Sequence, residues 1–102
     1  MRKWIVAALA VGFTGGGAQA DEVARQLGYV LASEAPCGMV FDQAAIERYI
    51  EDNVDAADMG FARRLTTSST AMTLYLEDYT ASQKTAHCAQ MRRVAKTYGF
   101  ID

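Results

Sequence analysis

The chain has 102 residues, enough for one domain, of which 51% are hydrophobic and 22% charged, with a single Pro. This composition excludes a disordered or collagen-like chain, and a formal net charge of −2 disfavours a general nucleic-acid binder. Two Cys and one His are too few for most all-protein metal sites, so we expect neither a metal ion nor a cofactor.

The first segment has the pattern of a secretory signal peptide. Arg2 and Lys3 form a positive start, residues 4–13 are apolar, and an Ala-x-Ala sequence ends at Ala20. A membrane span needs about 20 apolar residues, roughly twice the length of this run. We therefore predict cleavage after Ala20, which leaves residues 21–102 in the periplasm or secreted, with no membrane span. A retained N-terminal anchor is the alternative.

The first two predicted helices cover roughly 22–34 and 43–54, because apolar residues recur there at helical spacing. Pro36 ends the first helix, and Gly28 is expected to weaken it slightly. Asp42 is a suitable N-cap for the second. The apolar stripes are Val23, Leu27, Val30 and Leu31 in the first helix, and Ala45, Ile46, Tyr49, Ile50 and Val54 in the second.

A third helical period extends over roughly residues 61–79, with Asp55 or Asp58 as its candidate cap. It contains the hydroxyl run 66–70, whose side chains compete for backbone hydrogen bonds and are poor helix formers. We interpret the segment as one helix, either straight or bent, with a small-residue face on which another helix packs closely. The alternative is a break, with a new helix starting at residue 71.

The last predicted helix covers roughly residues 81–98. Thr80 and Gln83 have the spacing of a capping box, and Gly99 has the position of a left-handed stop, after which Phe100 or Ile101 folds back. Its inner face would consist of the Lys84 stem, Cys88, Met91, Ala95 and Tyr98, with Val94 beside it.

Four amphipathic helices without strand alternation predict an all-α fold, a small four-helix bundle. Residues 21–102 form one domain small enough to bury only about 60–65% of its unfolded surface. Cys37 and Cys88 are the only cysteines, and export would place them in an oxidising compartment. We predict one structural disulfide that joins the first connector to the last helix and contributes about 4 kcal/mol. A redox-active pair is the alternative, but no C-x-x-C motif is present.

Catalytic motifs are absent from the sequence, so we expect no enzyme activity. His87 is the only histidine, and its neighbour Cys88 is assigned to the disulfide, which removes a Cys–His nucleophile. Candidate hydroxyl partners for it lack a nucleophile-elbow context. The acidic segment 51–58 lacks the ligand spacing of a calcium loop. The serines that could act as a nucleophile with His87 are Ser68, Ser69 and Ser82.

Charge is segregated along the chain, with a net charge of −5 over residues 42–58 and +4 over residues 84–96. The two segments either attract each other within the fold or form patches for a protein partner or a second copy. Tyr75 and Tyr79 are further candidates for partner binding, with core packing as the alternative. The candidate partner-binding residues of the basic segment are Arg92, Arg93 and Lys96.

Three stretches resemble a group of small exported bacterial helical proteins without an assigned function. They are SEAPCG at 33–38, DQAAIERYI at 42–50 and HCAQMRRVAKTYGFI at 87–101. In plan, the exported chain is also similar to the HdeA-type periplasmic acid-stress chaperones, because a helix precedes the first cysteine and one disulfide would close a loop of about 50 residues. The local sequence around Cys37 departs from that family, and no client-binding residue carries over.

These observations predict an exported helical protein that binds proteins, with a chaperone-like role under stress. After loss of Arg2 and Lys3, eight basic residues face twelve acidic ones, so the net charge of −4 would become strongly positive in acid. The chain would then repel itself while the disulfide kept it compact. The alternative is a specific inhibitor, immunity or effector-like protein that binds one partner through its charged patches.

Overall fold

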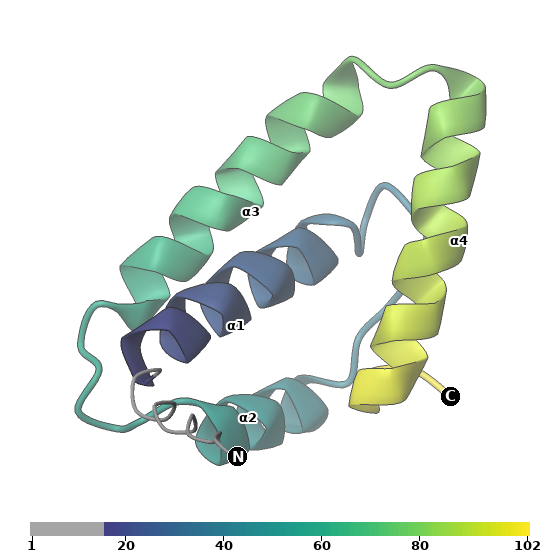
Figure 1. Ribbon diagram of the computed structural model, residues 1–102. Helices are drawn as coiled ribbons and strands as arrows, with labels where there is room; N and C mark the ends of the chain where they lie inside the picture. Colours follow the sequence, from purple (N-terminus) through teal and green to yellow (C-terminus); the bar gives the residue numbers. More distant parts are fainter. Residues whose placement is uncertain (1–15) are drawn as a thin grey trace, which may run out of the picture.

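A computed structural model describes residues 16–102 of the chain. The positive start and the apolar run of the predicted signal peptide lie outside the described residues. Four helices and no strand are present in residues 16–102, which confirms the all-α fold (Figure 1). In chain order they are α1 (Gly16–Ala32), α2 (Gln43–Asn53), α3 (Phe61–Glu77) and α4 (Ala81–Tyr98).

Helix α1 differs from its predicted bounds at both ends. It begins at Gly16 and ends at Ala32, whereas the apolar period predicts roughly 22–34. Alanine and glutamine precede the expected start, and both are strong helix formers that extend a helix backwards. After Ala32 the chain turns, with the Cys37 amide donating to the Ser33 carbonyl at 3.0 Å. The predicted cleavage point therefore lies within α1, and cleavage stays a prediction.

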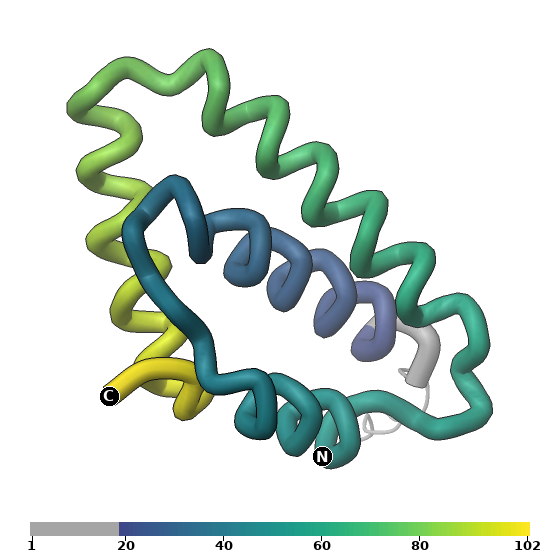
Figure 2. Tube along the Cα trace, turned by 180° about the vertical axis from the view of Figure 1, so that it is seen from behind, coloured from purple at the N-terminus to yellow at the C-terminus, as the bar shows by residue number. Residues whose placement is uncertain are grey.

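Helices α1 and α3 run side by side in the same direction and form the most extensive helix pair of the fold (Figure 2). Gly28 of α1 lies against the hydroxyl run of α3. A Cβ atom at Gly28 would be 2.7 Å from the Ser68 Cβ and 2.9 Å from the Leu65 carbonyl oxygen. This confirms that α3 is one helix with a small-residue face. Gly28, which the sequence marks only as a weak helix former, permits the close approach.

Helices α2 and α4 meet through an aromatic cluster near the C-terminus. The Tyr49 and Tyr98 rings stack at 4.5 Å, and Phe100, which is 1% exposed, lies 5.5 Å from the Phe41 ring. Burial, with the adjacent Tyr98 hydroxyl as a second cause, raises the pKa of Tyr49 to about 12. The core thus continues from α1 into this cluster. Its buried apolar residues include Ala24, Leu27, Val30, Met39, Ala45, Phe61 and Ala95.

Three of the predicted helix ends are confirmed. The Asp42 side chain accepts hydrogen bonds from the first turn of α2. Thr80 and Gln83 form a reciprocal capping box at the start of α4. Gly99 ends α4 in the left-handed region with φ of 82°, and Phe100 folds back so that its amide donates to the Ala95 carbonyl. All three depend on contacts between residues close in the chain.

The predicted cap of α3 is wrong. Gly60 occupies the N-cap position without a side-chain hydrogen bond. The Asp58 carboxylate instead accepts two hydrogen bonds from the Arg64 guanidinium, at 3.2 and 2.6 Å, and Asp55 accepts from the Ala57 amide. A bidentate pair with arginine is a stronger interaction for a carboxylate than one neutral amide, which accounts for the difference.

Candidate functional site

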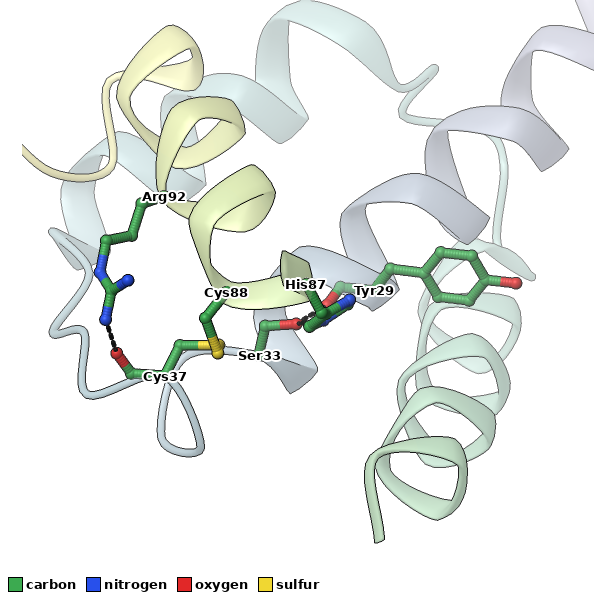
Figure 3. The surroundings of a disulfide bond; sticks show 6 residues. All are labelled: Tyr29, Ser33, Cys37, His87, Cys88 and Arg92. Carbon is green, nitrogen blue, oxygen red and sulfur yellow. Dashed lines mark hydrogen bonds between the residues drawn. A yellow bond between two sulfur atoms is a disulfide. The ribbon is translucent and has the colours of Figure 1, made fainter. Parts of the chain in front are cut away.

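The predicted disulfide is present and attaches α4 to the first connector (Figure 3). The Cα atoms of Cys37 and Cys88 are 5.4 Å apart, and both residues are buried. Beside the bond, Arg92 donates from Nη2 to the Cys37 carbonyl oxygen at 2.8 Å. Arg92, a candidate partner-binding residue from the sequence, thus supports the connector, and its role in partner binding stays a prediction.

His87 contacts a serine that the sequence does not single out. Its Nε2 lies 2.7 Å from the Oγ of Ser33, a fully buried residue, and the same Oγ donates to the Tyr29 carbonyl oxygen at 2.8 Å (Figure 3). The Ser33 hydroxyl has one proton, which it donates to the Tyr29 carbonyl. We therefore assign a proton to Nε2 of His87, and this N–H group donates to the Ser33 oxygen. The Ser33 hydroxyl is therefore committed to a backbone carbonyl and is not positioned as a nucleophile.

Burial lowers the pKa of His87 below its usual value of 6.5. The unfolded chain therefore binds this proton at a higher pH than the folded chain does. We predict that the free energy of unfolding falls as the pH drops below about 6.5 and levels off once the folded state is protonated as well. Urea denaturation at several pH values measures this.

His87→Gln, which keeps a hydrogen-bond donor toward Ser33, is the matched control. It should lose the dependence on pH in this window, while the dependence at lower pH from the carboxylates remains. An identical pH profile for the variant and the natural chain would contradict the assignment.

The second set of candidate residues lies where α3 meets α4. Leu74 and Tyr75 are each 58% exposed, and Tyr79 is half-buried by an edge contact of its ring with His87 at 5.8 Å. The opening turns of α4, residues 81–86, are exposed on every side. This end of the molecule therefore stands clear of the rest of the fold (Figure 1). We call Leu74, Tyr75 and Tyr79 the apolar corner.

The acidic and basic segments are both exposed and do not pair with each other. In residues 16–102 the ion pairs join Arg25 to Glu22, and Arg64 to Asp21 and Asp58. None of them links α2 to α4, so ion pairing within the fold does not account for the charge segregation. The exposed acidic residues at α2 are Asp42, Glu47, Glu51, Asp52 and Asp55, with Arg48 among them, and the exposed basic residues on α4 are Lys84, Arg92, Arg93 and Lys96.

The basic candidates do not share one role. Arg92 and Lys96 are four residues apart and lie on one side of α4, whereas Arg93 is turned by about 100°. Arg93 donates to the Gln90 side chain at 3.4 Å. Because Arg92 also supports the connector, Arg93 and Lys96 are the basic residues whose replacement would test an interface without disturbing the disulfide region.

The chain matches no protein-family model, no curated protein and no solved structure. Within residues 16–102, none of the helices has the length and apolarity required to cross a membrane. The same residues contain no group of three or more metal-ligating His, Cys, Asp or Glu side chains.

Proposed function

We propose that this chain is an exported helical protein that binds other proteins, with a chaperone-like role under acid stress in the bacterial envelope. The observation that carries the proposal is the apolar corner, where two large apolar side chains are exposed on a projecting end of the molecule. Aromatic residues with a polar tip are frequent anchors in protein interfaces. The signal-peptide pattern and the disulfide support export, because disulfides persist in oxidising compartments.

The titratable groups support a stepwise loosening in acid. Protonation of His87 affects α4 first, in the mildly acidic range below about 6.5. The Arg64 guanidinium lowers the pKa of Asp58, so this ion pair persists below the usual range of aspartate and is lost only as the pH falls through the lowered value. The connector before α3 therefore stays attached to α3 at a pH at which α4 already loosens. Such loosening would enlarge the apolar surface next to the corner, where Met72 and Leu76 are now buried.

A client-holding assay tests this proposal. The oxidised exported protein is mixed with an acid-unfolded client, and suppression of aggregation is followed at neutral and acid pH. Leu74→Gln with Tyr75→Gln removes the exposed apolar surface without introducing a poor helix former, and should abolish most of the suppression.

Met59→Gln is the control, because Met59 is 89% exposed on the connector between α2 and α3, away from the corner. Equal suppression by the corner variant and the control would overturn the proposal. Cross-linking capture in the native host gives a second readout, for which many unrelated envelope proteins, captured mainly in acid, are expected.

A specific binding protein of the inhibitor, immunity or effector type is the second candidate. It is favoured by the exposed acidic and basic patches that no ion pair joins. In this case cross-linking at neutral pH should capture one dominant partner, and Arg93→Glu with Lys96→Glu should lose it at low salt. Arg25→Glu with Arg63→Glu makes the same charge change at two exposed positions outside both segments and should keep the partner.

A further inference from the structure

A groove of about 370 Å³ lies beside the disulfide and is lined in part by Arg92, whose hydrogen bond to the connector Figure 3 shows. Pro36 and the two cysteines form an apolar wall. Lys84 and Thr85 line the groove together with Arg92. The groove therefore combines an apolar surface with two cations and a hydroxyl group, and no acidic residue lines it.

The two cations are available to an anionic ligand. In the described part of the chain neither Lys84 nor Arg92 forms an ion pair. Arg92 uses one N–H group on the Cys37 carbonyl, and a guanidinium has five. That hydrogen bond also restricts the Arg92 side chain, so less conformational entropy is lost when a carboxylate binds.

The spacing of the cations favours an extended ligand. Lys84 and Arg92 are eight residues apart on one helix, which separates them by about 12 Å along its axis. In an extended peptide, residues four apart are separated by about 13 Å and point to the same side. We propose that the groove binds an extended acidic segment of a partner protein that has two carboxylates four residues apart. Pro36 and the disulfide would contact the chain between them.

This site is separate from the apolar corner and goes beyond the chaperone-like function. It adds a preference for acidic segments at a surface next to the disulfide. A client held through apolar contacts at the corner and a peptide held through charge in the groove would contact different residues.

Titration of the oxidised exported protein with a blocked peptide tests the proposal. The probe has two Glu residues four positions apart with serines between them, and backbone amide shifts are followed by NMR. We expect shifts confined to the residues around Cys37 and Cys88. Lys84→Gln and Arg92→Gln should each weaken binding about three- to fivefold, and the double variant about tenfold or more.

Arg93→Gln, on the same helix but outside the groove, is the matched control and should bind as the natural chain does. The affinity of Lys84→Gln is the decisive measurement. Arg92→Gln also removes the hydrogen bond to the Cys37 carbonyl, so a loss of affinity in that variant could come from a change in the connector. Unchanged affinity in Lys84→Gln, or equal binding of a peptide with adjacent Glu residues, would overturn the proposal, and so would equal shifts with acetate alone. The corner variant Leu74→Gln with Tyr75→Gln should bind the peptide normally, so failure of one proposal is distinguishable from failure of the other.

Discussion

Replacing Cys37 and Cys88 together by alanine is expected to lower the free energy of unfolding by about 4 kcal/mol. The bond closes a loop with a sequence separation of 51, and the unfolded chain gains the corresponding entropy when it is removed. Helix α4 makes few contacts with α1, in contrast to the long α1–α3 contact, so the disulfide is a principal attachment of α4. For a domain whose total stability is about 5–15 kcal/mol, this is the largest effect we expect.

Urea denaturation of the oxidised protein and of the double variant measures the difference. A reductant should destabilise the natural chain to the level of the variant and leave the variant unchanged. Hydrogen exchange should rise more in α4 than in α1 and α3, because the latter two retain their mutual contact. Coincident unfolding curves for the oxidised chain and the variant would show that the bond does not stabilise the fold.

Gly28→Val is expected to destabilise the fold by about 2–4 kcal/mol through overpacking. An added Cβ would be 2.7 Å from the Ser68 Cβ and 2.9 Å from the Leu65 carbonyl oxygen, so α1 and α3 must move apart. Gly28→Ala should cost less, because alanine regains about 1 kcal/mol of helix propensity. Thermal or urea unfolding measures both variants.

Ala44→Val, at an exposed position of α2, measures the cost of a valine on a helix surface without a close contact. Valine is a better helix former than glycine, so helix propensity cannot account for a loss of stability in Gly28→Val. Addition of Ser68→Gly to Gly28→Ala should restore only part of the loss, since the Leu65 oxygen belongs to the backbone and remains. The close contact would be refuted if Gly28→Val unfolded at the same urea concentration as Ala44→Val.

Features that depend on neighbouring residues were predictable. The caps at Asp42 and Thr80 and the stop at Gly99 are hydrogen-bonded within one turn of the chain, and the residue types alone indicate them. The fold class and the disulfide follow from helical periodicity and from the presence of only two cysteines. The cap of α3 was missed because Arg64, six residues after Asp58, competes for the same carboxylate.

The candidate surfaces were predictable only as residue types. Tyrosine and arginine are frequent in interfaces, but their exposure depends on which helices cover them. Tyr75 on α3 is open to solvent, whereas Tyr79, which follows the end of α3, lies against His87, although the sequence places both on one helical period. Leu74 was not among the predicted residues, because a single exposed leucine is common on protein surfaces and does not by itself indicate an interface.

The amino-acid sequence therefore specifies the helices, most of their ends and the covalent link of Cys37 to Cys88. It does not specify the contacts between residues remote in the chain, such as His87 with Ser33 at a separation of 54 and Arg92 with Cys37 at 55. Nor does it indicate that Gly28 faces Ser68. Helix formation is governed by local hydrogen bonds and periodicity, whereas the pairing of helix faces depends on shape complementarity and burial summed over the whole core.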